Sequence, residues 1–594
     1  MGPSYTPEPY QTYIPPPRTF YPHPLTDLGA PLTYREQRLR AFTCAVRNKP
    51  NWTSKVLNRS IFVKWLREAR AADSEYSGDI LVWDSDDVNF VWQELNNYYN
   101  YVEALRAYGC MVEPDVDCVW RADGVVPEEL RQELINAVAT LENVPDHQKD
   151  WHPGSNGQVL DLVHPSLWPI IYGRSISLED GKIITAPLEA RRTSETTFES
   201  DYPDSDDSET SEASTYSDKF CWLPSEFKIS SDGKETKIAS YINNLSSMEQ
   251  QDLFYPILEK LFTHFVPLFN HVLADLSRSQ HRYLRDYEER PNGEPDFISG
   301  NVYDDKWEEI LDNFVKNNGL TVRYSDFAGN LCHSYPRCGS ACPNVHDNLG
   351  IYSVNDVEGI NTDCAWTSPV ISPEGRLEGR TMKVIVKLAN IVLTPENPYY
   401  YGGSWHIEAM LNERIVSTGI YYYAQENITD SALSFRTRFG DVEEDEGWAR
   451  MHGLSHQGNT IQDRGSIQTK EHRLIAFPNV LQHQVQPFQL IDPTKPGYRK
   501  ILVFFLCDPA HDVPTTRTVA AQQPEERSKV IDQLRASSLG SLPEEVFQMV
   551  VDGLPPVISR EEAETYRASL MRERSNFTRD SKHVQGREYN FCEH

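Results

Sequence analysis

A change to a period of two in the hydrophobic pattern, which begins at Met382 and recurs up to Asp508, constrains the fold of this chain more than any other feature. Alternation of apolar and polar residues is typical of strands with one buried face. Turn residues separate the alternating segments, for example at 395–398 and 492–497. Short strands joined by such turns indicate an antiparallel sandwich or jelly roll, whose open end is a natural place for a ligand site. The expected strands are 383–388, 403–408, 414–423, 432–439, 473–477, 481–490 and 500–506.

Two of these segments carry histidines in positions suited to a metal. Side chains two residues apart in a strand share a face, so His406 and Glu408 are expected to point the same way. Around His483, the imidazole shares its face with apolar residues while glutamines take the other face, which predicts that His483 points inward. Two histidines and one carboxylate with open positions form the set that holds non-haem Fe(II) in oxygenases.

Other histidines compete for such a role. His452 and His456 lie in the Gly- and charge-rich segment 440–465, which we interpret as a mobile loop and a candidate lid. His152 and His164 lie in stretches rich in aromatic residues, Pro and Gly, which indicate ordered irregular structure. Buried structural histidines are commoner than ligands in such places, so the structural interpretation is favoured for both.

A cluster of Cys332, His333, Cys338, Cys342 and His346 raises the question of zinc. Structural zinc sites usually combine two short Cys hooks separated by a longer span. Only one short hook, from Cys338 to Cys342, is present here. An irregular loop with reduced thiols is therefore favoured, and zinc stays the alternative.

The overall charge limits the classes of partner. The 594 residues carry a formal net charge of −30, which argues against general nucleic-acid binding, because a groove for a polyanion needs clustered Lys and Arg. No apolar run approaches the length of a membrane helix. Ten cysteines are scattered through the chain, which suits reduced thiols. These features predict an intracellular protein, in the cytoplasm or nucleus, and leave its oligomeric state open.

Outside the strand region, helical patterns dominate. Between Phe254 and Leu273, apolar residues recur at helical spacing and are expected to back a sheet, with Pro256 and Pro267 either kinking the helix or separating two segments. The stretch between Thr193 and Asp218 is rich in acidic residues, Ser and Thr. It is interpreted as a tolerated insertion, with control by phosphorylation as the alternative. The predicted division is a disordered Pro/Tyr-rich arm (1–35, or draped over a neighbouring domain), a mostly helical N-terminal lobe (36–190), an acidic Ser/Thr-rich disordered loop (191–218), a helical segment backing the core (219–330), the strand domain (331–515) and a C-terminal helical tail (516–594).

The order of the strand motif carries a resemblance. A His-x-carboxylate, a distal His 77 positions later and an Arg a further 16 positions on resemble the double-stranded β-helix of Fe(II)- and 2-oxoglutarate-dependent oxygenases. The resemblance implies an α+β fold with a jelly-roll core, a large N-terminal helical lobe and C-terminal helices. It also implies that His406, Glu408 and His483 are the catalytic iron ligands. Arg499 would bind the far carboxylate of 2-oxoglutarate, since a guanidinium can grip a carboxylate through two parallel hydrogen bonds.

Two departures and a second resemblance qualify this pattern. Glu408 stands where Asp is commonest in the family, although some members resembling the JmjC type use Glu, and the spacing from His483 to Arg499 is long. The phrases at 150–153, 240–244 and 497–500, with the His406 motif, are similar to an uncharacterised fungal family catalogued as a domain of unknown function. That likeness brings no activity with it.

The leading hypothesis is therefore a dioxygenase that uses Fe(II), 2-oxoglutarate and O2 to hydroxylate or demethylate an unidentified small molecule or protein side chain. The alternative is a non-catalytic interaction or scaffold protein on a jelly-roll fold, which predicts that His406, Glu408 and His483 do not converge. Tyr421 and Tyr423 share a strand face, where they either line the cavity or, as we favour, are ordinary strand aromatics.

Overall fold

The structure is a computed structural model that describes residues 21–29, 31–74, 85–107, 109–188, 215–277, 311–312, 314–315, 371, 375–408, 410–440, 449, 452–454 and 458–580. Most of the acidic loop, the Cys332 to His346 cluster and His456 lie outside the described residues. The zinc and phosphorylation hypotheses therefore stay predictions.

A large antiparallel sheet forms the centre of the molecule, which is a mixed α/β structure. Its strands follow the order β1-β2-β14-β11-β17-β9-β4-β3, and β7 joins β9 while pairing with β8. The strands are β1 (Val112–Pro114), β2 (Trp120–Asp123), β3 (Asp150–Trp151), β4 (Val159–Val163), β7 (Ser225–Ile229), β8 (Thr236–Ile238), β9 (Thr381–Leu393), β11 (Ile415–Glu426), β14 (Arg473–Pro478) and β17 (Gly497–Cys507).

A second layer packs on one face of this sheet. It contains the sheet β13-β12-β15 and the pair β10-β16, and a further small pair joins β5 and β6. Leu433 and Phe435 of β12 share a buried cluster with Ile420 and Phe505 of the large sheet, so the two layers pack face to face. We call the side of the large sheet that meets this layer the inter-sheet face. The bounds are β5 (Ile170–Ile171), β6 (Phe220–Cys221), β10 (Tyr399–Tyr400), β12 (Ala432–Arg438), β13 (Ile461–Gln468), β15 (Gln482–Val485) and β16 (Phe488–Gln489).

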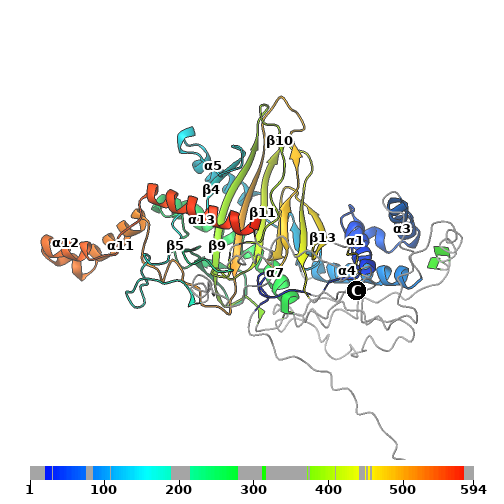
Figure 1. Cartoon of the computed structure of the whole chain (residues 1–594), viewed down its shortest axis with the longest axis horizontal. Coiled ribbons are helices and arrows are strands. Elements are labelled where there is room, and N and C mark those ends of the chain that lie inside the picture. Colours follow the sequence, from blue (N-terminus) through cyan, green and yellow to red (C-terminus); the bar gives the residue numbers. More distant parts are fainter. Residues whose placement is uncertain are drawn as a thin grey trace, which may run out of the picture.

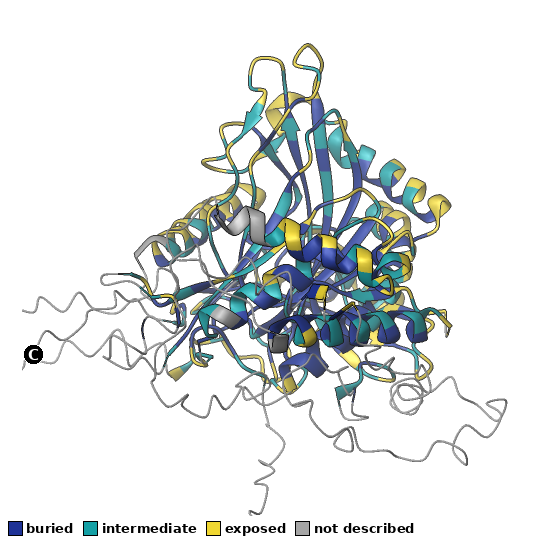
Figure 2. Ribbon diagram, turned by 90° about the vertical axis from the view of Figure 1, so that its right-hand side faces the viewer, coloured by how far each residue is buried: buried dark blue, intermediate teal, exposed yellow. Residues whose placement is uncertain are grey.

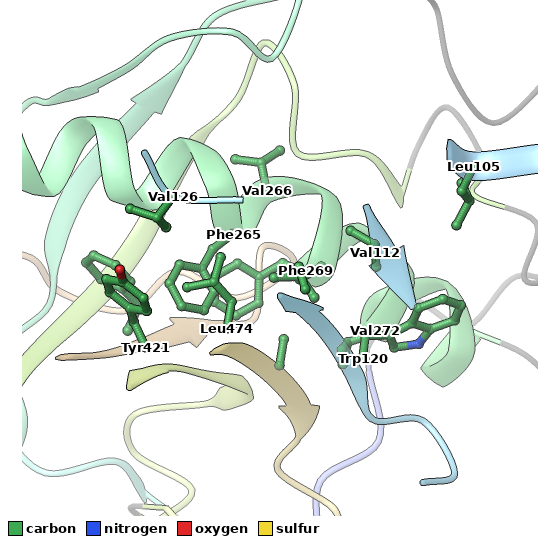
Figure 3. Packing of buried hydrophobic residues seen from close by; sticks show 14 of the residues in the cluster. Leu105, Val112, Trp120, Val126, Phe265, Val266, Phe269, Val272, Tyr421 and Leu474 are labelled. Atoms are coloured by element: carbon green, nitrogen blue, oxygen red, sulfur yellow. The ribbon is translucent and has the colours of Figure 1, made fainter. Parts of the chain in front are cut away.

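The other face of the large sheet is covered by α7 (Met248–Ser277), which runs unbroken through Pro256 and Pro267. Figure 3 shows Phe265 and Phe269 of this helix against Tyr421 and Leu474 of the strands. A Cβ on Gly419 of β11 would lie only 2.7 Å from Phe265, so the helix can approach this closely only over a glycine. The prediction that the apolar stripe backs a sheet is confirmed.

The remaining helices lie at opposite sides of the strands. In Figure 1, α1, α3 and α4 lie on one side and α11 and α12 on the other, and Figure 2 shows the buried residues gathered along the strands and on the inner faces of the helices. Every described helix is too short or too polar to span a bilayer. The helices are α1 (Tyr34–Arg47), α2 (Trp52–Val56), α3 (Arg59–Ser74), α4 (Ser85–Ala107), α5 (Glu128–Glu142), η1 (Asp146–Gln148), α11 (Pro524–Ala536), η6 (Ser538–Ser541), α12 (Glu544–Asp552) and α13 (Arg560–Asp580).

A capping box precedes α13. The backbone N–H of Glu562 donates to Ser559 Oγ at 3.2 Å, and the Ser559 N–H donates back to Glu562 Oε2 at 3.4 Å. This reciprocal pair satisfies two backbone donors that the first turn of a helix leaves free. The sequence therefore fixes where α13 begins.

Several expectations need correction. The region 36–190 is not helical throughout, because β1 to β4 join the large sheet and β5 pairs with β6. The segment 403–408 forms a single bridge at His406 instead of a strand. The expected strand 481–490 is divided into β15 and β16, since Pro487 has no N–H to donate. Part of the expected loop 440–465 belongs to β13, whose polar sequence hides its strand character.

The described part of the N-terminal arm is ordered against the rest of the chain. Leu32 donates its N–H to Gln462 Oε1 at 2.8 Å, and Gly29 forms a bridge with Phe439. Residues 21–29 and 31–33 therefore correct the prediction of disorder for the whole of 1–35 and agree with its alternative, an arm draped over its neighbours. Residues 1–20 lie outside the described residues.

Candidate metal site

The three side chains singled out in the strand region lie together. Nε2 of His483 is 3.3 Å from Glu408 Oε1, and Nε2 of His406 is 3.8 Å from the same oxygen. The two histidines pair through their backbones, with N–H···O distances of 3.2 and 3.0 Å. One candidate ligand atom from each residue falls within 4.8 Å of the other two. The convergence that the scaffold hypothesis excluded is therefore present.

The hydrogen bond of His406 determines which of its two ring nitrogens carries the proton. Its Nδ1 lies 2.7 Å from the carbonyl oxygen of Ser404, which can only accept, so Nδ1 carries the hydrogen and donates it. The lone pair of the neutral ring is then on Nε2, the nitrogen that faces Glu408. A backbone carbonyl on the far nitrogen is a common support for a metal-ligating histidine.

Glu408 is held by its backbone. Its N–H donates to Asn479 Oδ1 at 2.9 Å, and its carbonyl accepts from Asn479 Nδ2 at 3.0 Å. Asn479 is 1% exposed and follows β14, so one buried amide fixes the Glu408 peptide against the large sheet. Upstream, Gly402 has a φ of +92° and a Cβ there would lie 2.8 Å from the carbonyl oxygen of Val485. The backbone can pass this close to β15 only with glycine at position 402.

The protonation states suit a metal. Burial, together with the neighbouring charge of His483, lowers the pKa of His406 to about 4. Burial acts to raise the pKa of Glu408, but the hydrogen bond with His483 and nearby positive charges outweigh it and bring the pKa to about 2. At neutral pH His406 is therefore neutral and Glu408 is ionised, as metal ligation requires.

Arg499 lies on the inter-sheet face of β17 and is 1% exposed. Among the described residues, none accepts a hydrogen bond from its Nε, Nη1 or Nη2 atoms. Its guanidinium carbon lies 4.4 Å from the ring centroid of Phe488 and 5.8 Å from that of Tyr422. Burial lowers the pKa of Arg499. Aromatic rings offset only part of the loss of hydration, so this cation lacks the anion that buried guanidinium groups normally have.

The aromatic residues near this cation differ from those considered in the sequence. Tyr421 and Tyr423 both belong to the cluster packed under α7, so they are ordinary strand aromatics. Tyr422 takes the inter-sheet face instead and lies beside Arg499. Its position follows from alternation once the buried direction of β11 is known.

A second histidine–carboxylate group lies around β4. Asp161 Oδ2 is 2.8 Å from His152 Nδ1, 2.5 Å from Arg567 Nη2 and 3.9 Å from His164 Nε2. The backbone N–H of Ser166 donates to His164 Nδ1 at 3.2 Å, so in the neutral ring the hydrogen is on Nε2 and faces Asp161. Burial lowers the pKa of His164 well below its usual range. Oδ2 of this carboxylate is already occupied by donors, while its buried Oδ1 has no hydrogen-bond partner among the described residues.

Both terminal regions of the described chain contact the loop between β10 and β11, which carries His406 and Glu408. Leu25, which precedes α1, and Phe577 of α13 share one apolar cluster with Ile407, Met410 and Leu411. Ile407 lies between the two site residues of this loop, so this packing fixes the segment that carries them. Sequence reasoning missed these contacts because they join residues hundreds of positions apart.

A buried carboxylate adds a polar connection from α13 to the same loop. Glu413 is fully buried and accepts hydrogen bonds from the backbone N–H groups of Met410 at 3.0 Å and Trp222 at 2.8 Å. It also forms an ion pair with Arg574, whose guanidinium carbon lies 3.8 Å from the Trp222 ring centroid. The C-terminal helix therefore holds this loop through a charge as well as through apolar packing.

His452 is placed away from both groups. Its backbone carbonyl accepts from Gln462 at 3.3 Å and from Gln37 of α1 at 3.4 Å. Within the described ranges, only the His406 and His152 groups bring three potential ligands together. His452 is thus not a ligand in either of them.

Comparison with solved structures gives partial matches. A selenomethionine-labelled Fe(II)/α-ketoglutarate-dependent dioxygenase, TqaL, is 15% identical over 24% of this chain and 49% of its own, with a TM-score of 0.15. EvdO2 from Micromonospora carbonacea var. aurantiaca, in complex with 2-oxoglutarate, is 12% identical over 24% and 56% of the two chains, with a TM-score of 0.13. Oxalate decarboxylase from Lactobacillus farciminis is 16% identical over 37% and 54%, with a TM-score of 0.11. The matches span about half of those chains, and likenesses at these TM-scores carry no argument.

Sequence families give a clearer result. No protein of curated function matches this sequence. The family described as "Protein of unknown function (DUF4246)" matches residues 85–529, and its N-terminal domain matches residues 3–68. These two matches cover most of the chain. They include His406, Glu408, His483 and Arg499, and also His152, Asp161 and His164 of the second group. The chain therefore belongs to the DUF4246 family.

Proposed function

We propose that this protein is an Fe(II)- and 2-oxoglutarate-dependent oxygenase that hydroxylates or demethylates a second substrate. The observation that carries the proposal is Arg499, a fully buried guanidinium without a hydrogen-bond acceptor among the described residues. It lies on the inter-sheet face, which meets the second layer that contains His483. Such a group is expensive to bury unless an anion arrives. A dicarboxylate that bridges this cation and a metal accounts for it.

The strand order supports a double-stranded β-helix as the core. Along the chain, the large sheet receives β9, β11, β14 and β17, while β10, β12, β13, β15 and β16 belong to the second layer. Within the large sheet, the first and last of these strands, β9 and β17, are neighbours. This return of the last strand to the first is the connection pattern of a jelly roll.

The residues of the first group fit an iron ion. His406, Glu408 and His483 are proposed as its ligands, because they offer two imidazoles and one carboxylate whose candidate ligand atoms lie within 4.8 Å of one another. The Ser404 carbonyl keeps the Nε2 lone pair of His406 available, and Asn479 holds the Glu408 backbone in place. When bound, iron supplies the redox chemistry that activates O2.

The co-substrate is assigned to Arg499 and this group together. We assign Arg499 the far carboxylate of 2-oxoglutarate, held by two parallel hydrogen bonds, with Phe488 and Tyr422 excluding water around it. The near carboxylate and keto oxygen then face the metal ligands. In the balanced reaction, 2-oxoglutarate, O2 and a substrate R–H give succinate, CO2 and R–OH.

The test is anaerobic reconstitution with Fe(II), followed by exposure to O2 and 2-oxoglutarate and measurement of succinate. We expect iron to bind with a stoichiometry of about one, as one ligand set predicts, and succinate to form slowly even without the second substrate. A protein that binds no iron under these conditions would refute the proposal. Arg499→Met serves as the internal control, since it should bind iron and lose 2-oxoglutarate.

Arg499→Met also has a consequence for stability. Replacing a buried cation without a partner by an apolar side chain of similar length removes a desolvation penalty of about 1–3 kcal/mol. We therefore expect the variant without ligands to unfold at a higher denaturant concentration than the wild type. A lower midpoint would mean that Arg499 has a structural partner, and the assignment of the co-substrate would fail.

A further inference from the structure

A second cation without a partner lies on the same face as Arg499. In the ladder between β9 and β17, Lys387 lies directly opposite Val503, as Ile391 lies opposite Arg499. Residues directly opposite in an antiparallel pair share a face, and Val503 belongs to the cluster between the two layers. The side chain of Lys387 therefore projects from the inter-sheet face.

Among the described residues, no carboxylate lies close enough to this ammonium to form an ion pair. In the part of the chain that the structure describes, Lys387 has no ion pair and no hydrogen bond, whereas Lys383 on the same strand is paired with Asp512 at 2.6 Å. Lys387 is half-buried, so its charge is only partly hydrated. A half-buried ammonium on a face turned toward a ligand site is normally matched by an anion.

Its position is next to the metal ligands. The charge of Lys387 acts on His406 and Glu408 of the first group and on Asp161 and His164 of the second. The β4–β9 ladder ends with Val163 opposite Leu388, which brings the residues after β4 alongside this part of β9. Lys387 is thus within electrostatic range of both groups.

We propose that Lys387 anchors an anionic group, a carboxylate or a phosphate, of the second substrate. The proposal rests on the proposed function and adds the substrate class to it. On β9, Lys387 is four residues from Ile391, the residue that lies opposite Arg499. This separation corresponds to about 13 Å of strand. 2-Oxoglutarate uses one carboxylate at Arg499 and the other at the metal ligands, so Lys387 is left for a different anion.

An ammonium suits this role better than a guanidinium would. Lys presents a compact charge on a flexible stem and binds either a carboxylate or a phosphate without the planar match that Arg requires. The anion held at Lys387 would direct the rest of the substrate toward His406 and Glu408. Small organic acids and phosphorylated metabolites, or an acidic side chain of a protein, share this chemistry.

The first experiment needs neither metal nor a variant. The wild-type protein is treated with an N-hydroxysuccinimide ester at constant ionic strength in chloride, acetate or inorganic phosphate, and labelling of each lysine is followed by mass spectrometry. Acetate or phosphate should slow labelling of Lys387 by about threefold at an anion concentration of twice the Kd. The exposed Lys182 serves as the reference, since its side chain is 79% accessible. Equal protection of both lysines, or none, overturns the proposal.

The second experiment tests proximity to the metal. In the Mn(II)-loaded protein with 2-oxoglutarate present, the paramagnetic ion should broaden the 31P signal of phosphate or the 13C signal of acetate. Lys387→Gln should abolish this broadening, Lys387→Arg should retain part of it, and Lys383→Gln should behave as the wild type. The stronger of the two probes identifies carboxylate or phosphate as the preferred group.

The outcomes separate this proposal from the proposed function. If 2-oxoglutarate alone protects Lys387 and removes the broadening, Lys387 belongs to the co-substrate site and the proposal falls while the oxygenase assignment stands. If the wild type binds no Mn(II), the oxygenase assignment falls, and labelling still decides whether Lys387 is an anion site. Broadening that survives Lys387→Gln overturns the proposal directly.

Discussion

Two histidine–carboxylate–histidine groups lie in the described part of this protein, and they differ in what already surrounds the carboxylate. Asp161 accepts from Arg567 and from His152, so a protein cation has taken the place that a metal could occupy. Among the described residues, the side chain of Glu408 pairs only with the two imidazoles of its own group. The same residue types therefore give a closed group on β4 and an open one between β10 and β11.

The far nitrogen of one histidine in each group explains the difference further, whereas Nδ1 of His483 has no hydrogen-bond partner among the described residues and leaves its tautomer free. His406 donates from Nδ1 to a carbonyl, which leaves a lone pair on Nε2, whereas His164 accepts at Nδ1 and so carries hydrogen on Nε2. A metal can bind only a nitrogen with a lone pair. Proximity of ligand atoms is thus insufficient to predict a metal site, because the hydrogen bond on the opposite side of the ring decides whether the ligand is available.

The largest expected effect is on metal binding. His406→Ala should abolish Mn(II) binding, since it removes one of three protein ligands, and loss of a supporting partner alone costs up to about 100-fold. His164→Gln should leave the Kd within about threefold of the wild type, because its Nε2 is a donor. Mn(II) titration followed by electron paramagnetic resonance measures both. Loss of binding in His164→Gln would make the second group a metal site and end the distinction.

Stability should show the reverse order. Asp161→Asn leaves the buried Arg567 with Asp150 as its remaining charged partner and should lower the free energy of unfolding by about 2 kcal/mol. Glu408→Gln should change it by less than about 1 kcal/mol, because an amide can still accept from His483 and no cation loses its partner. Urea unfolding of both variants without metal measures the two effects. A larger loss in Glu408→Gln than in Asp161→Asn would contradict the assignment of open and closed groups.

Helix α13 offers a matched pair of arginines for a finer test. Arg567 and Arg574 are seven residues apart, so they lie on one face, and the first reaches Asp161 while the second reaches Glu413. Arg574→Gln should weaken Mn(II) binding by about tenfold, because it loosens the loop after Glu408. Arg567→Gln should lower stability and leave the Mn(II) Kd unchanged. Equal effects of the two variants on metal affinity would mean that α13 acts on the whole fold and not on one group.

A further prediction concerns pH dependence. The pKa of His406 in the folded protein is about 4, below its ordinary value of 6.5. As the pH falls through this window the unfolded chain takes up the proton first, so the metal-free protein loses stability between pH 6.5 and 4. His406→Gln should flatten that part of the profile. Mn(II) should steepen the dependence of stability on pH in the wild type and in His164→Gln. It should have no influence in His406→Gln. Thermal unfolding between pH 6.5 and 4 measures these differences.

Sequence pattern predicted the members of the first group for a definite reason. Alternation around His483 fixed its direction, and the His-x-carboxylate motif supplied the other two residues. That segment is not a strand, however, and the two side chains converge because a backbone bridge and Asn479 hold it. An Asn just after a strand is a common backbone partner, which is the only sequence signal that pointed to Asn479.

Pattern alone was weaker where long-range pairing decides the outcome. Nothing local to Asp161 indicates that Arg567, more than four hundred residues later, would neutralise it. Tyr422 and Lys387 required the buried direction and register of β11 and β9, and a one-residue error in either would turn both side chains to the wrong face. The resemblance suggested a role for Arg499, but its burial and its lack of a partner are visible only once its surroundings are known.

The contact of Leu25 and Phe577 with Ile407 has a consequence for biosynthesis. A nascent chain contains all three proposed ligands by residue 483, yet the loop that carries two of them gains Phe577 and Arg574 only when α13 has been made. Ribosomes add roughly 5–20 residues per second, so this interval lasts several seconds. Iron acquisition would therefore be the last step of maturation, after translation of α13, and the half-made protein would not hold a reactive metal.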